Sequence, residues 1–135
     1  MSFANLNYLA IVIAAVVAFG VGALWYGVLF SRPWLAAVGK TEAQIRANAT
    51  PVPYAVSLVA NVVMAVILSA LMHSLGQATV AGGLALGGLM WLGFAMPTLA
   101  VNNAFAQQDK ALLWIDGGHW LAVLLAIGLV IGVAG

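Results

Sequence analysis

Four long apolar stretches constrain the fold of this chain more than any other feature of its sequence. They run over Tyr8–Leu29, Tyr54–Leu75, Val80–Val101 and Ala111–Ala134. Each has about the 20 residues that an α-helix needs to cross the hydrocarbon core of a bilayer. None alternates between polar and apolar residues, as the strands of a membrane barrel do, so helices are expected. We therefore predict an all-α fold, a polytopic four-transmembrane-helix bundle that forms a single domain over residues 1–135.

The composition excludes several classes of protein and of site. Charged residues make up 5% of the chain and apolar residues 65%, so the chain has too little charge to cover the surface of a soluble domain. The expected partner is the lipid bilayer, because four basic residues are too few for a face that binds nucleic acid. The absence of cysteine excludes disulfides, thiolate catalysis and thiolate metal sites. With no catalytic motif in the sequence, we expect no enzyme activity and no cofactor.

The N-terminal segment is expected to stay in the protein as the first span. It lacks the basic region of a cleaved signal peptide, and its apolar stretch is longer than that of a signal sequence. The basic residues then predict the topology, because Lys and Arg are retained on the cytoplasmic side. Arg32, Lys40 and Arg46 lie between the first two spans and Lys110 between the last two, whereas the middle connection and both tails have none. We predict that loop 31–53 is cytoplasmic and that both termini lie outside.

The cytoplasmic loop carries signals for short helices at the membrane surface. Pro33 suits the first turn of a helix and Gly39 its end. Thr41 followed by Gln44 resembles a capping box that opens a second helix, and Thr50-Pro-Val-Pro53 should end it before the second span. We expect one or two interfacial helices here; the alternative is an ordered connector without a role at the interface.

Asp116 is the one charged residue inside a predicted span. An ionisable side chain in a bilayer is costly, which makes it a candidate for function. It lies six residues after Lys110, roughly 9 Å along a helix, and His119 follows on the same helix face. Residues of the other spans lie at a similar depth and complete the predicted polar intramembrane site: Tyr26, Asn61, Asn102 and Asn103.

Two interpretations of this polar site remain open from the residues alone. In the first, Asp116 and His119 are a protonatable pair that serves transport and binds a small ligand or ion. In the second, Asp116 accepts hydrogen bonds from Asn61, Tyr26 or an indole and clamps the helices together. We predict no metal site, because two ligands three residues apart need one or two more, and His73 lies at the opposite end of its span.

Small residues and one proline are expected to shape the packing of the helices. Pairs of small residues four positions apart allow two helix backbones to approach closely, within the bundle or between subunits. Three such pairs occur: Ala23 with Gly27, Gly83 with Gly87, and Gly128 with Gly132. They lead us to expect a homo-oligomer, most simply a dimer. Pro97 lacks a backbone donor and should bend the third span.

Several of these segments together resemble a known family. Trp25-Tyr-Gly-Val-Leu-Phe30 with the following Trp34, then Gly39-Lys-Thr41 and Asp116-Gly-Gly-His119 are similar to small four-helix bacterial and fungal membrane proteins, catalogued as domain-of-unknown-function family 1761. The resemblance covers almost the whole chain and implies this fold, a multi-pass location in the bacterial inner (cytoplasmic) membrane, and a recurring Asp–His element in span four. It implies no activity. The small multidrug transporters share only the architecture, because they carry a membrane-embedded glutamate in the first helix and span one here has no acidic residue.

The function that we predict is therefore oligomeric transport of a small molecule or ion through a site that contains Asp116 and His119. The alternative is a non-catalytic membrane scaffold or accessory subunit in which the pair is a hydrogen-bond clamp. A water-accessible cavity that reaches Asp116 favours the first function, and a dry, fully bonded Asp116 favours the second.

Overall fold

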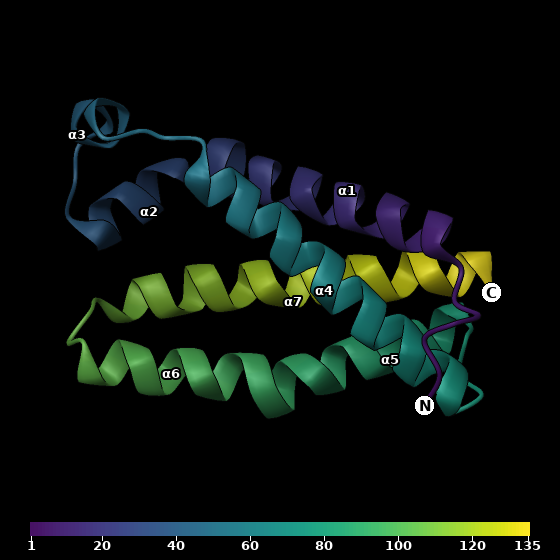
Figure 1. Ribbon diagram of the computed structural model, residues 1–135. Helices are drawn as coiled ribbons and strands as arrows, with labels where there is room; N and C mark the ends of the chain where they lie inside the picture. Colours follow the sequence, from purple (N-terminus) through teal and green to yellow (C-terminus); the bar gives the residue numbers. More distant parts are fainter.

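The computed structural model describes residues 1–135 and consists of helices alone, which confirms the predicted all-α fold (Figure 1). Four apolar helices are long enough to cross a membrane, so the protein is a membrane protein. The elements in chain order are α1 (Tyr8–Leu24), the π-helix η1 (Trp25–Leu29), α2 (Ser31–Val38), α3 (Glu42–Ala47), α4 (Val52–Ser74), α5 (Val80–Met90), the π-helix η2 (Trp91–Ala95), α6 (Met96–Phe105) and α7 (Lys110–Ala134).

Helix α7 is the central element of the bundle. It contacts α1, α4, α5 and α6, and Figure 1 shows it between α5–α6 on one side and α1 with the obliquely crossing α4 on the other. Both termini lie at one end of the molecule, and α2, α3 and the turn between α6 and α7 lie at the other. This second end also carries every Lys, Arg, Asp and Glu of the chain except Asp116, and we call it the charged end.

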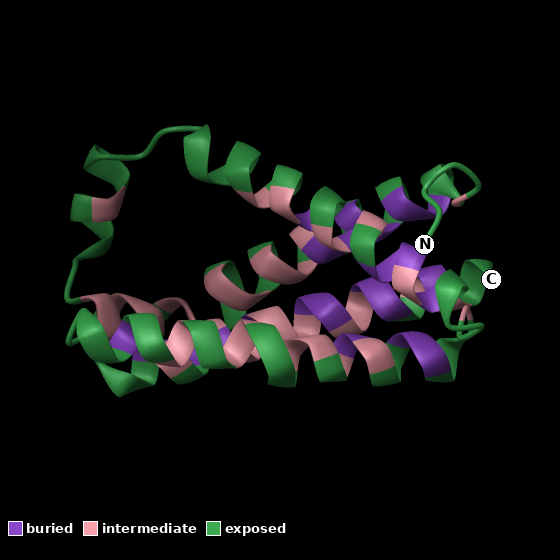
Figure 2. Cartoon of the chain, turned by 60° about the horizontal axis from the view of Figure 1, so that its bottom comes forward, coloured by how far each residue is buried: buried purple, intermediate pink, exposed green.

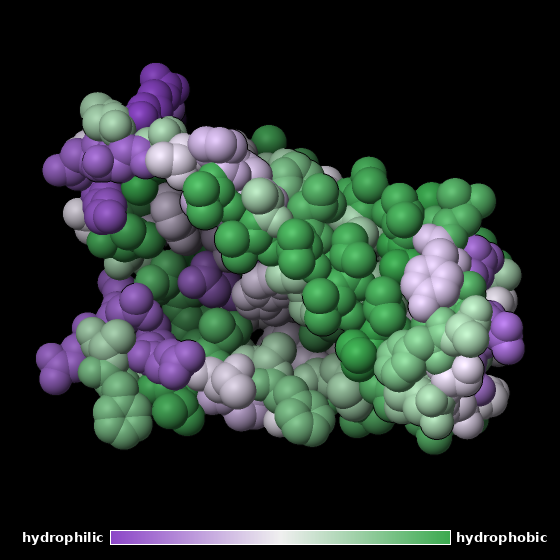
Figure 3. Space-filling model, in the orientation of Figure 1, coloured by the Kyte–Doolittle hydropathy of each residue, from purple (hydrophilic) through white to green (hydrophobic).

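A dense apolar core fills the half of the bundle near the termini. Figure 2 shows most of the buried residues in this half. The core cluster consists of residues from α1, α4 and α7, each 2% exposed or less: Ile11, Ala14, Ala18, Ala65, Leu68, Met72, Val123, Ile127 and Ile131. The outward faces of the helices are apolar as well (Figure 3), as a surface that contacts lipid must be.

Glycines bring α5 and α7 into backbone contact. A methyl group added to Gly83 would overlap the carbonyl group of Gly128, and one added to Gly87 or Gly132 would overlap a carbonyl group of the facing helix. The small-residue pairs of spans three and four therefore pack within the chain. The pair in span one does not, because Ala23 and Gly27 are exposed and no atom lies within 4 Å of the position of a Cβ on Gly27.

Two of the four membrane-spanning helices contain a π-helical turn. The turn η1 ends the first span, and η2 lies near the middle of the third. Pro97 was expected to bend the third span; the π-helix η2 ends two residues before this proline. The hydroxyl of Thr98 donates to the carbonyl oxygens of Phe94 and Ala95, at 2.8 Å each, and so satisfies acceptors near the turn. The sequence did not predict η1, where the N–H of Phe30 donates to the carbonyl of Trp25 at 2.8 Å.

Loop 31–53 forms the two short helices that its sequence indicates. Gly39 ends α2 with a φ of 77°, in the left-handed region. Thr41 and Gln44 form the capping box that starts α3, with hydrogen bonds of 3.2 and 2.9 Å. Four span boundaries differ from those predicted. Helix α4 runs from Val52 to Ser74, since Pro53 fits the first turn of a helix. Helix α6 continues to Phe105, and α7 begins at Lys110.

Candidate intramembrane polar site

The centre of the site is a hydrogen bond between the first and the fourth span. The hydroxyl of Tyr26 in η1 donates to Oδ1 of Asp116 in α7 at 2.6 Å, and both side chains are half-buried. A π-helical turn has more residues than an α-turn, so its consecutive side chains point in more similar directions. This lets Trp25 and Tyr26, adjacent in the sequence, both reach α7.

Two indole groups bind the backbone of α7 on either side of Asp116. Nε1 of Trp25 donates to the carbonyl of Ile115 at 3.0 Å, and Nε1 of Trp91 donates to the carbonyl of Gly117 at 2.7 Å. The tryptophans come from η1 and η2, so each π-helical turn supplies one of these donors. Spans one and three are thus tied to the same short segment of span four.

The glycines next to Asp116 make room for these contacts. A Cβ on Gly117 would lie 2.6 Å from Sδ of Met96, and one on Gly118 would lie 2.9 Å from Cζ2 of Trp25. Any side chain here would push the indole or the thioether away from α7. The Asp116-Gly-Gly-His119 segment therefore packs closely against the Trp25 and Tyr26 side chains.

His119 lies on the core side of this contact. Its ring is 6% exposed, and its centroid is 4.9 Å from that of Tyr26 and 4.6 Å from that of Trp120. Nδ1 is buried and has no hydrogen-bond partner, so it does not bond to Asp116. Gly22 of α1 faces the other ring nitrogen, since a Cβ there would lie 3.1 Å from Nε2.

The asparagines predicted at this depth divide into two groups. Asn61 of α4 is 2% exposed, and its Oδ1 has no partner. Asn103 instead closes the turn before α7, where its Nδ2 donates to the carbonyl of Asp109 at 3.1 Å. Asn102 is exposed and lines an open pocket of about 390 Å³ with Pro97, Thr98 and Val101. Of the predicted residues, Tyr26 therefore contacts both Asp116 and His119. Asn61 makes no hydrogen bond to them through Oδ1. The side chains of Asn102 and Asn103 make other contacts.

Two members of the site, Trp25 and Trp91, were not among the residues predicted for it. The signal was present, because an indole in the interior of a span needs a partner for its N–H, whereas tryptophans at the interface can use water. The direction in which the Asn102 and Asn103 side chains point around their helix could not be predicted from residue type. Both follow η2, and a π-helical turn shifts the direction of every side chain after it relative to a regular helix.

A hollow lies at the charged end of the molecule. Figure 3 shows this hollow between the α2–α3 segment and the ends of α6 and α7, with most of the hydrophilic residues around it. No group of three or more His, Cys, Asp or Glu side chains lies close enough to hold a metal ion. The polar contacts of the site are the Tyr26–Asp116 hydrogen bond and the two hydrogen bonds from indole N–H groups to carbonyl groups of α7.

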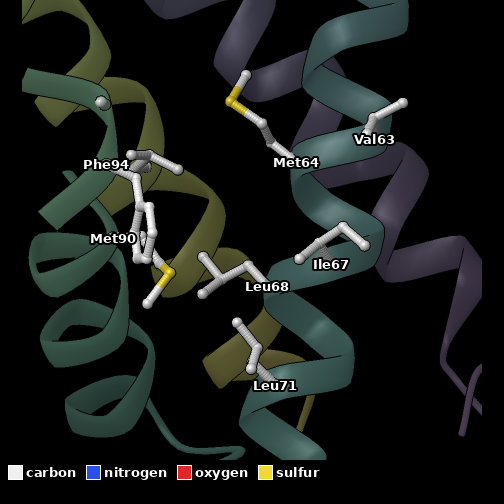
Figure 4. Close-up of a pocket in the computed structure, with 9 residues that line it drawn as sticks. Val63, Met64, Ile67, Leu68, Leu71, Met90 and Phe94 are labelled. Atoms are coloured by element: carbon white, nitrogen blue, oxygen red, sulfur yellow. The ribbon is translucent and has the colours of Figure 1, made fainter. Parts of the chain in front are cut away.

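A second, wholly apolar pocket lies between α4 and the α5–η2 segment. It has a volume of about 330 Å³ and nine apolar lining residues, among them Met64, Leu68, Met90 and Phe94. Figure 4 shows these side chains pointing toward one another across the groove, with no polar group among them. The groove therefore has no chemistry to add to the polar site.

Comparison with curated proteins and with solved structures gives no match for this chain. A family model described as "Protein of unknown function (DUF1761)" matches residues 9–132, which include all of the site described above. The chain therefore belongs to this family of proteins of unknown function.

Proposed function

We propose that this protein is a multi-pass transport protein of the bacterial inner membrane, in which Asp116 takes up and releases a proton as a small molecule or ion moves. The observation that carries the proposal is the state of this carboxyl group. Asp116 is the only acidic residue inside a span, and the chain provides it with one side-chain partner, Tyr26.

A carboxyl group that served only as a clamp would have all its acceptor sites filled by the protein. A carboxylate offers about four lone-pair sites, and Tyr26 occupies one of them at Oδ1. The other oxygen, Oδ2, makes no hydrogen bond to the chain and is not sealed from solvent. Asp116 thus keeps an oxygen free for water, a proton or a cation.

We place the access to Asp116 at the charged end in this conformation. The core cluster fills the opposite half of the bundle, so a transport cycle needs a second conformation that opens the site toward the termini. The π-helical turns η1 and η2 both border Asp116, and such turns are frequent at functional sites and mark places where a helix can change its register. We place the hinges of the cycle there.

We propose a homodimer as the working unit. Span one presents an exposed face of small residues, Gly20, Ala23 and Gly27, and nothing in the chain packs on Gly20 or Gly27. Such faces bring membrane helices together. Mass measurement in nanodiscs should give two copies, and Gly27→Ile should give one, whereas Gly93→Ile, also in open space on span three, should leave two. Wild-type protein that is monomeric in nanodiscs contradicts the dimer.

The proposal is tested by proton flux in liposomes. Purified protein is reconstituted with a pH-sensitive dye inside, and a potassium gradient with valinomycin drives proton uptake. We expect flux above that of empty liposomes, its loss in Asp116→Asn, and its retention in Asp109→Asn. The second variant is a matched control, because Asp109 caps α7 outside the span through its side chain and asparagine caps a helix equally well. Flux that is equal in the two variants, or absent in the wild type, overturns the proposal.

A second candidate is the scaffold or accessory subunit, and one observation favours it. Trp25, Tyr26 and Trp91 all bond to a three-residue segment of α7, as expected of a contact that holds helices together. Under this function the wild type shows no flux and Asp116→Asn folds and assembles normally, while Asp116→Leu destabilises the bundle because Tyr26 loses its acceptor.

A further inference from the structure

Two buried polar atoms of the bundle have no partner in the chain. They are Nδ1 of His119 and Oδ1 of Asn61, on side chains that are 6% and 2% exposed. A buried polar atom without a hydrogen bond is strongly unfavourable, and in native proteins it is usually satisfied by an ordered water. Both atoms therefore point to a ligand that can form hydrogen bonds.

The register of the helices places both side chains at the same edge of the apolar core. His119 lies one helical turn before Val123 on α7, and Asn61 lies one turn before Ala65 on α4; Val123 and Ala65 both belong to the core cluster. On α1 the corresponding residue, one turn after the core residue Ala18, is Gly22, which faces the ring of His119. The layer next to the core thus contains a histidine, an asparagine and a glycine.

We infer that His119 and Asn61 bind internal water in this layer, on the core side of the Tyr26–Asp116 hydrogen bond. Water suits both atoms, because it can donate to the amide oxygen and can either donate to or accept from an imidazole nitrogen. Gly22 faces Nε2 of the ring, where a Cβ would lie 3.1 Å away, so Nδ1 remains the ring nitrogen without a partner in the chain. A metal ion is disfavoured as the ligand, because no group of three or more His, Cys, Asp or Glu side chains lies close enough to hold one.

The layer is closed on its core side, because Ala18, Ala65 and Val123 in the next layer are 0% exposed. The two polar atoms are themselves buried, which favours a small ligand. The water position stands by itself; its consequence for transport rests on the proposed function. Within that function, the species that passes Asp116 toward the core is a proton carried by water, and an organic solute does not enter this layer.

The first test compares the thermal stability of two variants in the full-length protein. Asn61→Leu removes the amide group. If Oδ1 were truly without a partner, this change would remove an unfavourable group and raise the unfolding temperature. With bound water we expect the unfolding temperature to fall by at least as much as in Ser69→Ala, a control that removes another fully buried polar group of α4. A higher unfolding temperature for Asn61→Leu overturns the inference.

The second test observes the water at His119 directly by solid-state NMR of protein with ¹⁵N-labelled histidine in nanodiscs. The exposed His73 gives the reference cross-peak to water, and His119→Phe assigns the other signal. We expect a water cross-peak from the His119 ring that is lost in Asn61→Leu. The inference that the two side chains share this water is overturned if the water cross-peak of His119 is absent in the wild type. It is also overturned if the cross-peak persists unchanged in Asn61→Leu. A normal cross-peak in protein that shows no proton flux would refute transport and leave the water site intact.

Discussion

At the scale of single residues, the hydroxyl of Tyr26 fixes the position of Asp116. Tyr26→Phe removes the donor and leaves a half-buried acceptor with one bond fewer. We expect a loss of about 1–3 kcal/mol in the free energy of unfolding, measured by denaturant titration in detergent. Tyr8→Phe removes a hydroxyl that bonds to the carbonyl of Phe3 in an exposed position and should change the stability by about 0.5 kcal/mol or less. Equal effects of the two substitutions would contradict a special role for the Tyr26 hydroxyl.

Asp116 could be identified from the sequence because a charged residue type inside an apolar span is costly. Tyr26 could be identified because its distance from the end of its span places it at a similar depth in the membrane. Both quantities can be read from a sequence. The direction of a side chain around its helix is different, because it depends on every turn before it. This is why Asn103 was expected beside Asp116 and instead bonds to Asp109. The indole of Trp91 was missed because its acceptor is a backbone carbonyl, which no residue type marks.

At the scale of elements, the contact between α5 and α7 depends on glycine. In Gly83→Ala the new methyl group meets the carbonyl of Gly128, so the two helices must move apart. We expect a loss of about 1–3 kcal/mol, measured as above. Gly88→Ala on the same helix has nothing within 4 Å and should be neutral or stabilising by up to about 1 kcal/mol, because alanine has the higher helix propensity. If Gly83→Ala is as stable as Gly88→Ala, the backbone contact is wrong.

Elements that depend on local signals were predictable, and those that depend on packing were not. The capping box of Thr41 and Gln44 and the left-handed Gly39 involve neighbours in the sequence, and both are present. The π-helical turn η1 has no proline to mark it. Its geometry is associated with the contacts that Trp25 and Tyr26 make ninety positions away on α7, and contacts at that distance are not visible in a single sequence.

At the scale of the whole molecule, the charged end gathers Arg32, Lys40, Arg46 and Lys110. The positive-inside rule then predicts that this end is cytoplasmic and that both termini lie outside. Alkaline phosphatase fused after Gly135 should be active, and green fluorescent protein fused at the same place should not fluoresce. The opposite pair of results would invert the topology and would place the charged end outside.

The central claim, that Asp116 exchanges a proton with water from the charged end, is tested most directly by infrared difference spectroscopy of the protein in bilayers at changing pH. The chain has three acidic side chains, Glu42, Asp109 and Asp116, so the carboxyl bands can be assigned by single substitutions. We predict a carboxylic acid band that titrates, that is lost in Asp116→Asn and that is kept in Asp109→Asn. If no titrating band disappears in Asp116→Asn, the carboxyl group is a fixed structural clamp and the account is contradicted.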